Sequence, residues 1–201
     1  MLAVVGGHSR NVGKTSVMAG LIAALRQGHW TAMKITQLGH GICSSEGEPC
    51  GCEEELDHPY ALTEEKEPSG KTDSARYLAS GAARSFWLRT RVGALGHAMP
   101  AVREILGGSA NAIVESNSIL QFLKPDVYVV VADPAVADFK ESARRCLDRA
   151  DAVVLIERDR APAWEGIPER LWAAKPRFVV KPGDYRSAEL AEFVGTRLAS
   201  A

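Results

Sequence analysis

The stretch that most constrains the fold lies near the amino terminus, where an apolar run leads through a glycine-bearing turn into a helical pattern. Residues 2–5 are continuously apolar, which predicts a short buried strand. Residues 17–25 are apolar at helical spacing, and Gly-Lys-Thr-Ser stands directly before them. A strand that enters a helix through such a turn gathers unpaired backbone N–H groups at the helix start. The stretch therefore predicts an α/β protein with an anion-binding turn.

The turn has the composition of a phosphate-binding P-loop. Gly13 lets backbone N–H groups face a phosphate without a Cβ in the way, Lys14 would bridge the β- and γ-phosphates, and the Thr15 hydroxyl would ligate Mg²⁺. The usual spacing places glycine six residues before the lysine, where this chain has His8, and the glycine stands one residue earlier, at Gly7. A chance Gly-Lys-Thr is disfavoured because strand, loop and helix all agree. The residues expected to contact the nucleotide are Gly7, His8, Ser9, Arg10, Asn11, Val12, Gly13, Lys14, Thr15 and Ser16.

Strand and helix patterns alternate along the rest of the chain. Continuous apolar strands such as residues 127–131 indicate burial on both faces, as in a parallel sheet covered by helices. We expect strands at residues 2–5, 29–35, 85–90, 111–115, 126–132, 152–156 and 177–180, and helices at residues 14–27, 73–84, 99–106, 137–149, 166–174 and 187–198. The predicted fold is a three-layer α/β sandwich of P-loop NTPase type. Its mostly parallel sheet has about seven strands, and one domain covers residues 1–201.

Residues 36–72 form a long polar stretch, which we expect to be a loop insertion. Three of the four cysteines lie in it, and the fourth, Cys146, is expected to be a core thiol. Thiolates with imidazole suit Zn²⁺, and an iron–sulfur cluster is the second choice. The candidate ligands are Cys43, Cys50, Cys52 and His58, with His40 as an alternative fourth ligand. The spacing matches no standard zinc finger, so free thiols in a loop are the competing interpretation.

The string Gly-His-Ser-Arg-Asn-Val-Gly-Lys-Thr resembles the P-loops of dethiobiotin synthetase and of the cobyric acid synthase group. That P-loop class also holds the nitrogenase iron protein, signal-recognition GTPases and nickel-insertion GTPases. A second resemblance, over the amino-terminal part, is to molybdopterin-guanine dinucleotide biosynthesis protein B. It rests on Lys34, on Ser-Gly-Lys-Thr-Asp-Ser-Ala-Arg at residues 69–76, and on Ser-Gly-Ala at residues 80–82. An extra threonine separates Lys71 from Asp73, which departs from that family's Gly-Lys-Asp-Ser.

The resemblance implies roles for three further residues. Lys34 matches a lysine at the end of the second strand that points toward the γ-phosphate or substrate, and the alternative is a surface lysine. Glu115 matches the glutamate of a Val-Glu-Gly motif and would hold Mg²⁺ or, alternatively, cap the following turn. Asp73 would be a further Mg²⁺ ligand or a helix cap. The expected catalytic residues are Lys14, Lys34 and Glu115. This chain has Val-Glu-Ser-Asn-Ser, without the glycine.

Base recognition is left open between ATP and GTP. The chain has no Asn-Lys-x-Asp guanine motif, and the loops at residues 157–159 and 181–184 occupy the usual base-reading positions. Asp184 could accept a hydrogen bond from a guanine edge, although a Pro-Gly-Asp turn is the commoner explanation.

The composition of the chain limits the kinds of partner that we expect it to bind. Lysine and arginine total 24 against 25 aspartate and glutamate, so the net charge of −1 gives no footprint for nucleic acid or an anionic membrane. No apolar run reaches the roughly 18 residues of a membrane span. With no signal peptide recognised at Met1 and no disulfide framework, we expect a cytoplasmic protein. Relatives in this class often pair across the nucleotide, which suggests a homodimer.

Three functions compete at this point. The first is a slow or partner-stimulated Mg²⁺-dependent NTPase, similar to the molybdopterin-guanine dinucleotide protein, with a partner protein in cofactor biosynthesis. The second is a nucleotide-controlled metallochaperone that carries metal on the cysteine loop. The third is a kinase or ligase like dethiobiotin synthetase, which the missing glycine after Glu115 disfavours.

Overall fold

The computed structural model describes residues 1–38, 58–162, 164 and 166–200. The strands are β1 Leu2–Gly7, β2 Thr31–Leu38, β3 Tyr60–Glu65, β4 Arg84–Arg91, β5 Ala112–Glu115, β6 Val127–Ala132, β7 Ala152–Ile156 and β8 Arg177–Val180. The α-helices are α1 Lys14–Ala24, α2 Asp73–Ala79, α3 Leu95–Gly107, α4 Glu141–Arg144 and α5 Ala188–Ala199. Single turns of 3₁₀ helix include η1 Arg26–Gly28, η3 Ser118–Gln121, η4 Leu147–Arg149 and η5 Glu169–Leu171.

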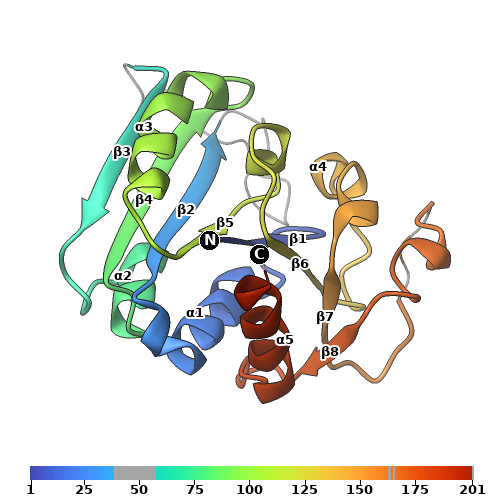
Figure 1. Cartoon of the computed structure of the whole chain (residues 1–201). Helices are drawn as coiled ribbons and strands as arrows, with labels where there is room; N and C mark the ends of the chain where they lie inside the picture. Colours follow the sequence, from blue (N-terminus) through green and yellow to red (C-terminus); the bar gives the residue numbers. More distant parts are fainter. Residues whose placement is uncertain (39–57, 163, 165, 201) are drawn as a thin grey trace.

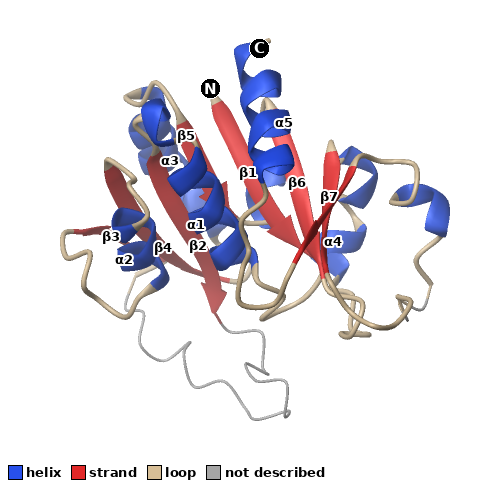
Figure 2. Cartoon of the chain, turned by 90° about the horizontal axis from the view of Figure 1, so that it is seen from below, coloured by secondary structure: helices blue, strands red, loops and turns tan. Residues whose placement is uncertain are grey.

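The described strands form one eight-stranded sheet in the order β3-β4-β2-β5-β1-β6-β7-β8. Strand β3 runs antiparallel to β4, and the other neighbours run parallel. Helices cover both faces of the sheet, as Figures 1 and 2 show. This confirms the predicted α/β fold. Because β1 lies between β5 and β6, the turn after β1 sits at the middle of the carboxyl edge, where parallel sheets bind ligands.

Each face of the sheet has its own apolar core. On one face, α1, α2 and α5 pack on the strands through buried side chains such as Leu21, Tyr77 and Leu190. On the other face, α3, η3 and α4 contribute residues such as Met99 and Ile119. Every residue of β6 is buried, as its unbroken apolar run predicts. Burial on both faces fixes the central strands and thereby the loops at their carboxyl ends.

Three predicted helices are much shorter in the structure. The helix expected at residues 73–84 ends at Ala79, because Gly81 has a φ of 105° and Arg84 already begins β4. In the stretch 137–149, the helix is limited to residues Glu141–Arg144 because the preceding backbone is bonded to the turn after β1: Lys140 N–H donates to His8 O at 2.8 Å. In the stretch 166–174, only η5 forms. Gly166 has a φ of 69°, and Pro168 biases the residue before it away from helix.

The stretch 36–72, expected to be a loop throughout, contains an edge strand. Strand β3 pairs with β4 from Tyr60 opposite Thr90 to Glu65 opposite Ser85. Its side chains are mostly half-buried and include two glutamates, so the sequence lacks the clear alternation of a strand. Helix α3 also begins earlier than predicted, at Leu95, which places Pro100 inside the helix rather than in its first turn.

The end of β1 is fastened by a side chain from the loop after β5. The Asn117 amide donates to Gly7 O at 2.8 Å and accepts from Gly7 N–H at 3.0 Å, as a neighbouring strand would. A Cβ on Gly6 would lie 2.2 Å from Asn117 Oδ1 and 2.8 Å from the Tyr128 ring. Glycine at position 6 is therefore required by this close approach.

We expect Gly6→Ala to lower the free energy of unfolding by about 1–3 kcal/mol, because the added methyl group overpacks this contact. The matched control is Gly107→Ala, where a Cβ meets nothing within 4 Å and the residue ends α3. Urea unfolding monitored by circular dichroism measures both variants. Equal stability of the Gly6 variant and wild type would contradict the packing account.

Candidate functional site

The turn after β1 has the backbone of an anion-binding loop. Asn11 has a φ of 54° and Gly13 a φ of 87°, and Gly13 directly precedes the first residue of α1. Lys14 folds back over the loop, where its Nζ donates to Ser9 O at 2.9 Å. Burial lowers the pKa of Lys14. An anion bound here would offset that burial, because it would supply a charge partner for the lysine.

Side chains from four elements converge beside this loop. Thr15 of α1 donates from its hydroxyl to Glu115 Oε2 at 2.8 Å, and Glu115 ends β5. Lys34 of β2 donates from Nζ to Glu115 Oε1 at 3.2 Å and to Thr15 Oγ1 at 3.4 Å. The same ammonium forms an ion pair with Asp73 of α2. Burial alone would lower the pKa of Lys34, but the carboxylates of Glu115 and Asp73 raise it. The structure thus brings together Thr15, Lys34, Asp73 and Glu115, the residues that the sequence analysis connected with Mg²⁺ or the γ-phosphate beside Lys14.

Asp73 is not the helix cap. The cap of α2 is Thr72, whose Oγ1 accepts from Ala75 N–H at 3.1 Å. The Asp73 carboxylate instead turns toward Lys34 and lies 3.7 Å from Arg76 Nη1. Of the two roles that the sequence left open for Asp73, the geometry favours participation in the site.

Helix α2 contributes two further residues that the sequence analysis missed. The fully buried Tyr77 donates from its hydroxyl to Glu115 Oε2. Burial and the Glu115 carboxylate raise the pKa of Tyr77 well above its ordinary value, so it is a neutral donor. Arg76 donates from Nη2 to Ser16 Oγ at 3.0 Å. Arg76 ends the Ser-Gly-Lys-Thr-Asp-Ser-Ala-Arg string of the second resemblance but was given no role there, and no motif pointed to Tyr77.

A cavity of about 330 Å³ lies over the loop, of a size that suits a small ligand. It is lined by Asn11, Val12, Gly13, Lys14, Thr15, Ser16, Lys34, Asp73, Arg76, Glu115 and Tyr185. Most of the expected loop residues therefore border one space, together with both lysines and both carboxylates.

The sequence analysis expected His8 to contact the nucleotide, but the structure places its side chain in the core. Its side chain is fully buried, with ring centroids 5.1 Å from Phe139 and 5.3 Å from Trp164. Asp133 N–H donates to Nδ1 at 3.4 Å, and Nε2 is 3.0 Å from Val136 O, an arrangement that suits the neutral ring protonated at Nε2. Burial lowers the pKa of His8 accordingly. Because its backbone groups are also bonded, His8 anchors the loop to the core instead of facing the cavity.

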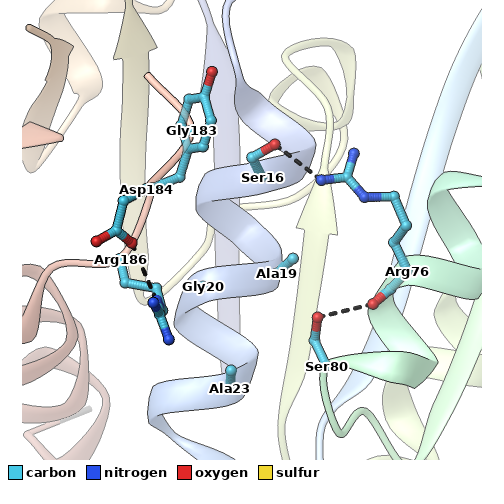
Figure 3. A pocket seen from close by; sticks show the side chains of 10 residues that line it. Ser16, Ala19, Gly20, Ala23, Arg76, Ser80, Gly183, Asp184 and Arg186 are labelled. Carbon is cyan, nitrogen blue, oxygen red and sulfur yellow. Dashed lines mark hydrogen bonds and ion pairs between the residues drawn. The ribbon is translucent and has the colours of Figure 1, made fainter. Parts of the chain in front are cut away.

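A groove of about 380 Å³ runs along the outer side of α1 (Figure 3). It shares Ser16, Arg76 and Tyr185 with the cavity over the loop. At its far wall, Asp184 Oδ1 accepts from Arg186 Nε at 3.1 Å, and Asp184 closes a turn with Lys181. This arrangement favours the turn interpretation of Asp184 over guanine recognition.

The candidate zinc ligands mostly lie outside the described residues. Cys43, Cys50, Cys52 and His40 fall within residues 39–57, whereas His58 is described and exposed. Within the described part of the chain, no group of three histidine, cysteine, aspartate or glutamate side chains is placed to hold a metal. Cys146 is buried, as expected for a core thiol. None of the helices in the described ranges combines the length and apolar character needed to cross a bilayer.

Comparisons with known proteins extend the assignment of the fold. No family model matches this chain, and no curated protein sequence matches it. Among solved structures, the chain is similar to the crystal structure of HypB from Helicobacter pylori in complex with nickel, with a TM-score of 0.53 and 13% sequence identity. The match covers 98% of this chain and 87% of the HypB chain. At this identity the likeness concerns the fold alone, and it does not favour the molybdopterin-guanine dinucleotide family.

Proposed function

We propose that this protein binds and hydrolyses a nucleoside triphosphate in a Mg²⁺-dependent reaction. The observation that carries the proposal is the convergence of Lys14, Thr15, Lys34 and Glu115 on one cavity over a loop of P-loop geometry. These side chains come from three elements that are far apart in the sequence. Phosphoryl transfer needs little more from a protein than positioning and stabilisation of negative charge, which are the properties this cavity offers.

The phosphate chain is held by the loop and by the start of α1. The N–H groups that begin a helix have no partners within the helix, and the helix dipole adds positive potential at that end. Lys14 would exchange its bond to Ser9 O for the β- and γ-phosphates. Since the lysine is already half-buried, part of its hydration is lost before it makes that contact.

The donor set beside Lys14 fits a magnesium ion. The Thr15 hydroxyl and the Glu115 and Asp73 carboxylates already surround a cation, the Lys34 ammonium, and hydroxyl and carboxylate oxygens are the ligands that Mg²⁺ prefers. Bound there, Mg²⁺ would neutralise charge on the phosphates. Lys34 would then turn from the carboxylates toward the γ-phosphate, in the role that the sequence suggested for it. The described residues present no obvious general base.

A specific observation favours metal handling as a second candidate function. Helix α2 follows the stretch that holds three cysteines, and its first residues contact the nucleotide cavity through Asp73 and Arg76. The HypB structure of similar fold was solved in complex with nickel. We infer that nucleotide state and metal binding at the cysteines are coupled through α2. The molybdopterin-guanine dinucleotide and dethiobiotin synthetase hypotheses gain no such support from the geometry or the comparison.

Replacing Lys14 with alanine should abolish detectable binding of Mg²⁺–ATP and Mg²⁺–GTP. The loss of one charged phosphate contact is expected to cost about 2 kcal/mol or more, at least about 30-fold in affinity. Isothermal titration calorimetry on both nucleotides measures the effect and also distinguishes the bases. Lys124→Ala, at an exposed position that does not line the cavity over the loop, is the control. An affinity unchanged in the Lys14 variant would refute the P-loop assignment.

Replacing Glu115 with glutamine should slow hydrolysis far more than it weakens binding. The amide keeps the shape and can still accept from Thr15, but it removes the charge proposed to hold Mg²⁺. We expect single-turnover hydrolysis to fall by about 100-fold, with Kd within about 5-fold of wild type. Glu104→Gln on the exposed side of α3 serves as the control. Normal turnover in the Glu115 variant would reject its role in the reaction.

The double variant Cys50→Ser/Cys52→Ser should lose bound Zn²⁺ or Ni²⁺, because the serine hydroxyl is a poor substitute for a thiolate ligand. Metal content by elemental analysis compares it with wild type and with Cys146→Ala, which removes the buried thiol. If metal handling is under nucleotide control, the metal Kd of wild type should differ by about 5-fold or more between diphosphate and triphosphate-analogue states. Equal metal content in all three proteins would exclude these cysteines as ligands.

A further inference from the structure

A second cavity adjoins the cavity over the loop at Lys14 and Glu115. Its volume is about 480 Å³, within the range of small-molecule sites. Lys14 and Glu115 line both this cavity and the one over the loop, so the two spaces meet where the terminal phosphate of a bound nucleotide would lie. The remaining lining differs from that of the first cavity and contains no helix-start residue of α1 other than Lys14.

The floor of this second cavity is rich in hydroxyl groups. Ser116 and Ser118 follow β5, are largely buried, and lie with their Oγ atoms 3.0 Å apart. Between them, Asn117 is committed to Gly7, which fixes the loop. Gln37 of β2 adds an amide from the opposite wall. These groups offer several hydrogen bonds to a polar ligand from positions that the fold holds in place.

Lys140 and Lys14 supply the positive charge of the cavity, whose lining also includes the carboxylates of Glu115 and Glu141. The Lys140 N–H donates to His8 O at 2.8 Å, which holds this residue against the P-loop. Burial, followed by the nearby charges of Lys14 and Arg10, lowers the pKa of Lys140 to about 8, while Asp138 opposes the shift. Among the described residues, no ion pair joins the Lys140 ammonium to a carboxylate, and Asp138 already accepts from Ser9 at 2.5 Å. A cation in such surroundings is stabilised by an added anion.

We propose that the second cavity binds a small molecule through a carboxylate or phosphate group, with Lys140 as the main contact and the Ser116 and Ser118 hydroxyls as further donors. Oxyanions bind best to a charged donor combined with neutral ones, which this wall and floor provide. The site lies beside the terminal phosphate, so its occupant would be an effector or an acceptor of the proposed NTPase. The statement that the occupant lies beside a terminal phosphate rests on the proposed function. The binding of an oxyanion by the cavity itself does not.

The test is calorimetric titration of inorganic phosphate and of malonate into protein loaded with Mg²⁺ and the β,γ-imido analogue of the preferred nucleotide. The loaded analogue keeps the probes out of the P-loop. We expect wild type to bind at least one probe, Lys140→Gln to bind it about 10-fold or more weakly, and Lys140→Arg to stay within about 3-fold. Ser118→Ala should weaken binding by a few-fold. The control Lys124→Gln, at an exposed position outside this cavity, should match wild type. The tighter probe tells whether phosphate or carboxylate is preferred.

Three results would overturn the inference. One is the absence of probe binding to loaded wild type. The second is equal probe affinity in Lys140→Gln and wild type. The third is a 10-fold loss of triphosphate-analogue affinity in Lys140→Gln with diphosphate affinity unchanged, which would assign Lys140 to the γ-phosphate itself. Failure of the analogue to bind wild type would instead refute the proposed function. The Lys140 comparison would then be repeated on nucleotide-free protein carrying Lys14→Ala.

Discussion

The rest of the site depends on the hydrogen bonds and the ion pair that surround the buried carboxylate of Glu115. A carboxylate with this little exposure is costly unless charges and donors surround it. Here the donors come from Thr15 of α1, Lys34 of β2 and Tyr77 of α2, so three elements must meet at the end of β5. The register of the sheet makes this meeting possible, because Glu115 pairs with Val5 on one side and with Lys34 on the other. The pairing of the strands and the electrostatics of Glu115 therefore favour the same arrangement of α1, α2, β2 and β5.

The unusual spacing of the loop is explained by two anchors. Asn117 continues the hydrogen-bond ladder of Gly7, and His8, where the usual motif has glycine, is held in an aromatic pocket below the loop. In Val-Glu-Ser-Asn, Ser116 stands in place of the glycine of Val-Glu-Gly, and its hydroxyl accepts from Ile119 N–H at 3.2 Å. A loop fixed at both points loses little conformational entropy when an anion binds, which favours pre-organised binding.

Local patterns predicted much of this architecture, and tertiary contacts account for what they missed. Strands 152–156 and 177–180 match residue for residue, because they are short apolar runs bounded by polar residues. The proximity of Lys34 and Glu115 to the turn after β1 could be predicted because it follows from motif and strand position. The contribution of Tyr77 could not, because it depends on how α2 lies against β5. Strand β3 escaped prediction for a similar reason: its pairing with β4, rather than its own pattern, makes it a strand.

Helix α2 is the element through which nucleotide and metal could influence each other. It is short, and its contacts with the nucleotide cavity are polar: Asp73 with Lys34, and Arg76 with Ser16. Polar contacts of this kind can exchange partners at low cost, whereas the apolar packing of α1 and α5 on the sheet cannot. A ligand shifts an equilibrium only by its differential affinity for two states. Because Lys34 can pair with Asp73 or with phosphate, but not fully with both, the proposed nucleotide binding would provide such a difference directly at the first residue of α2.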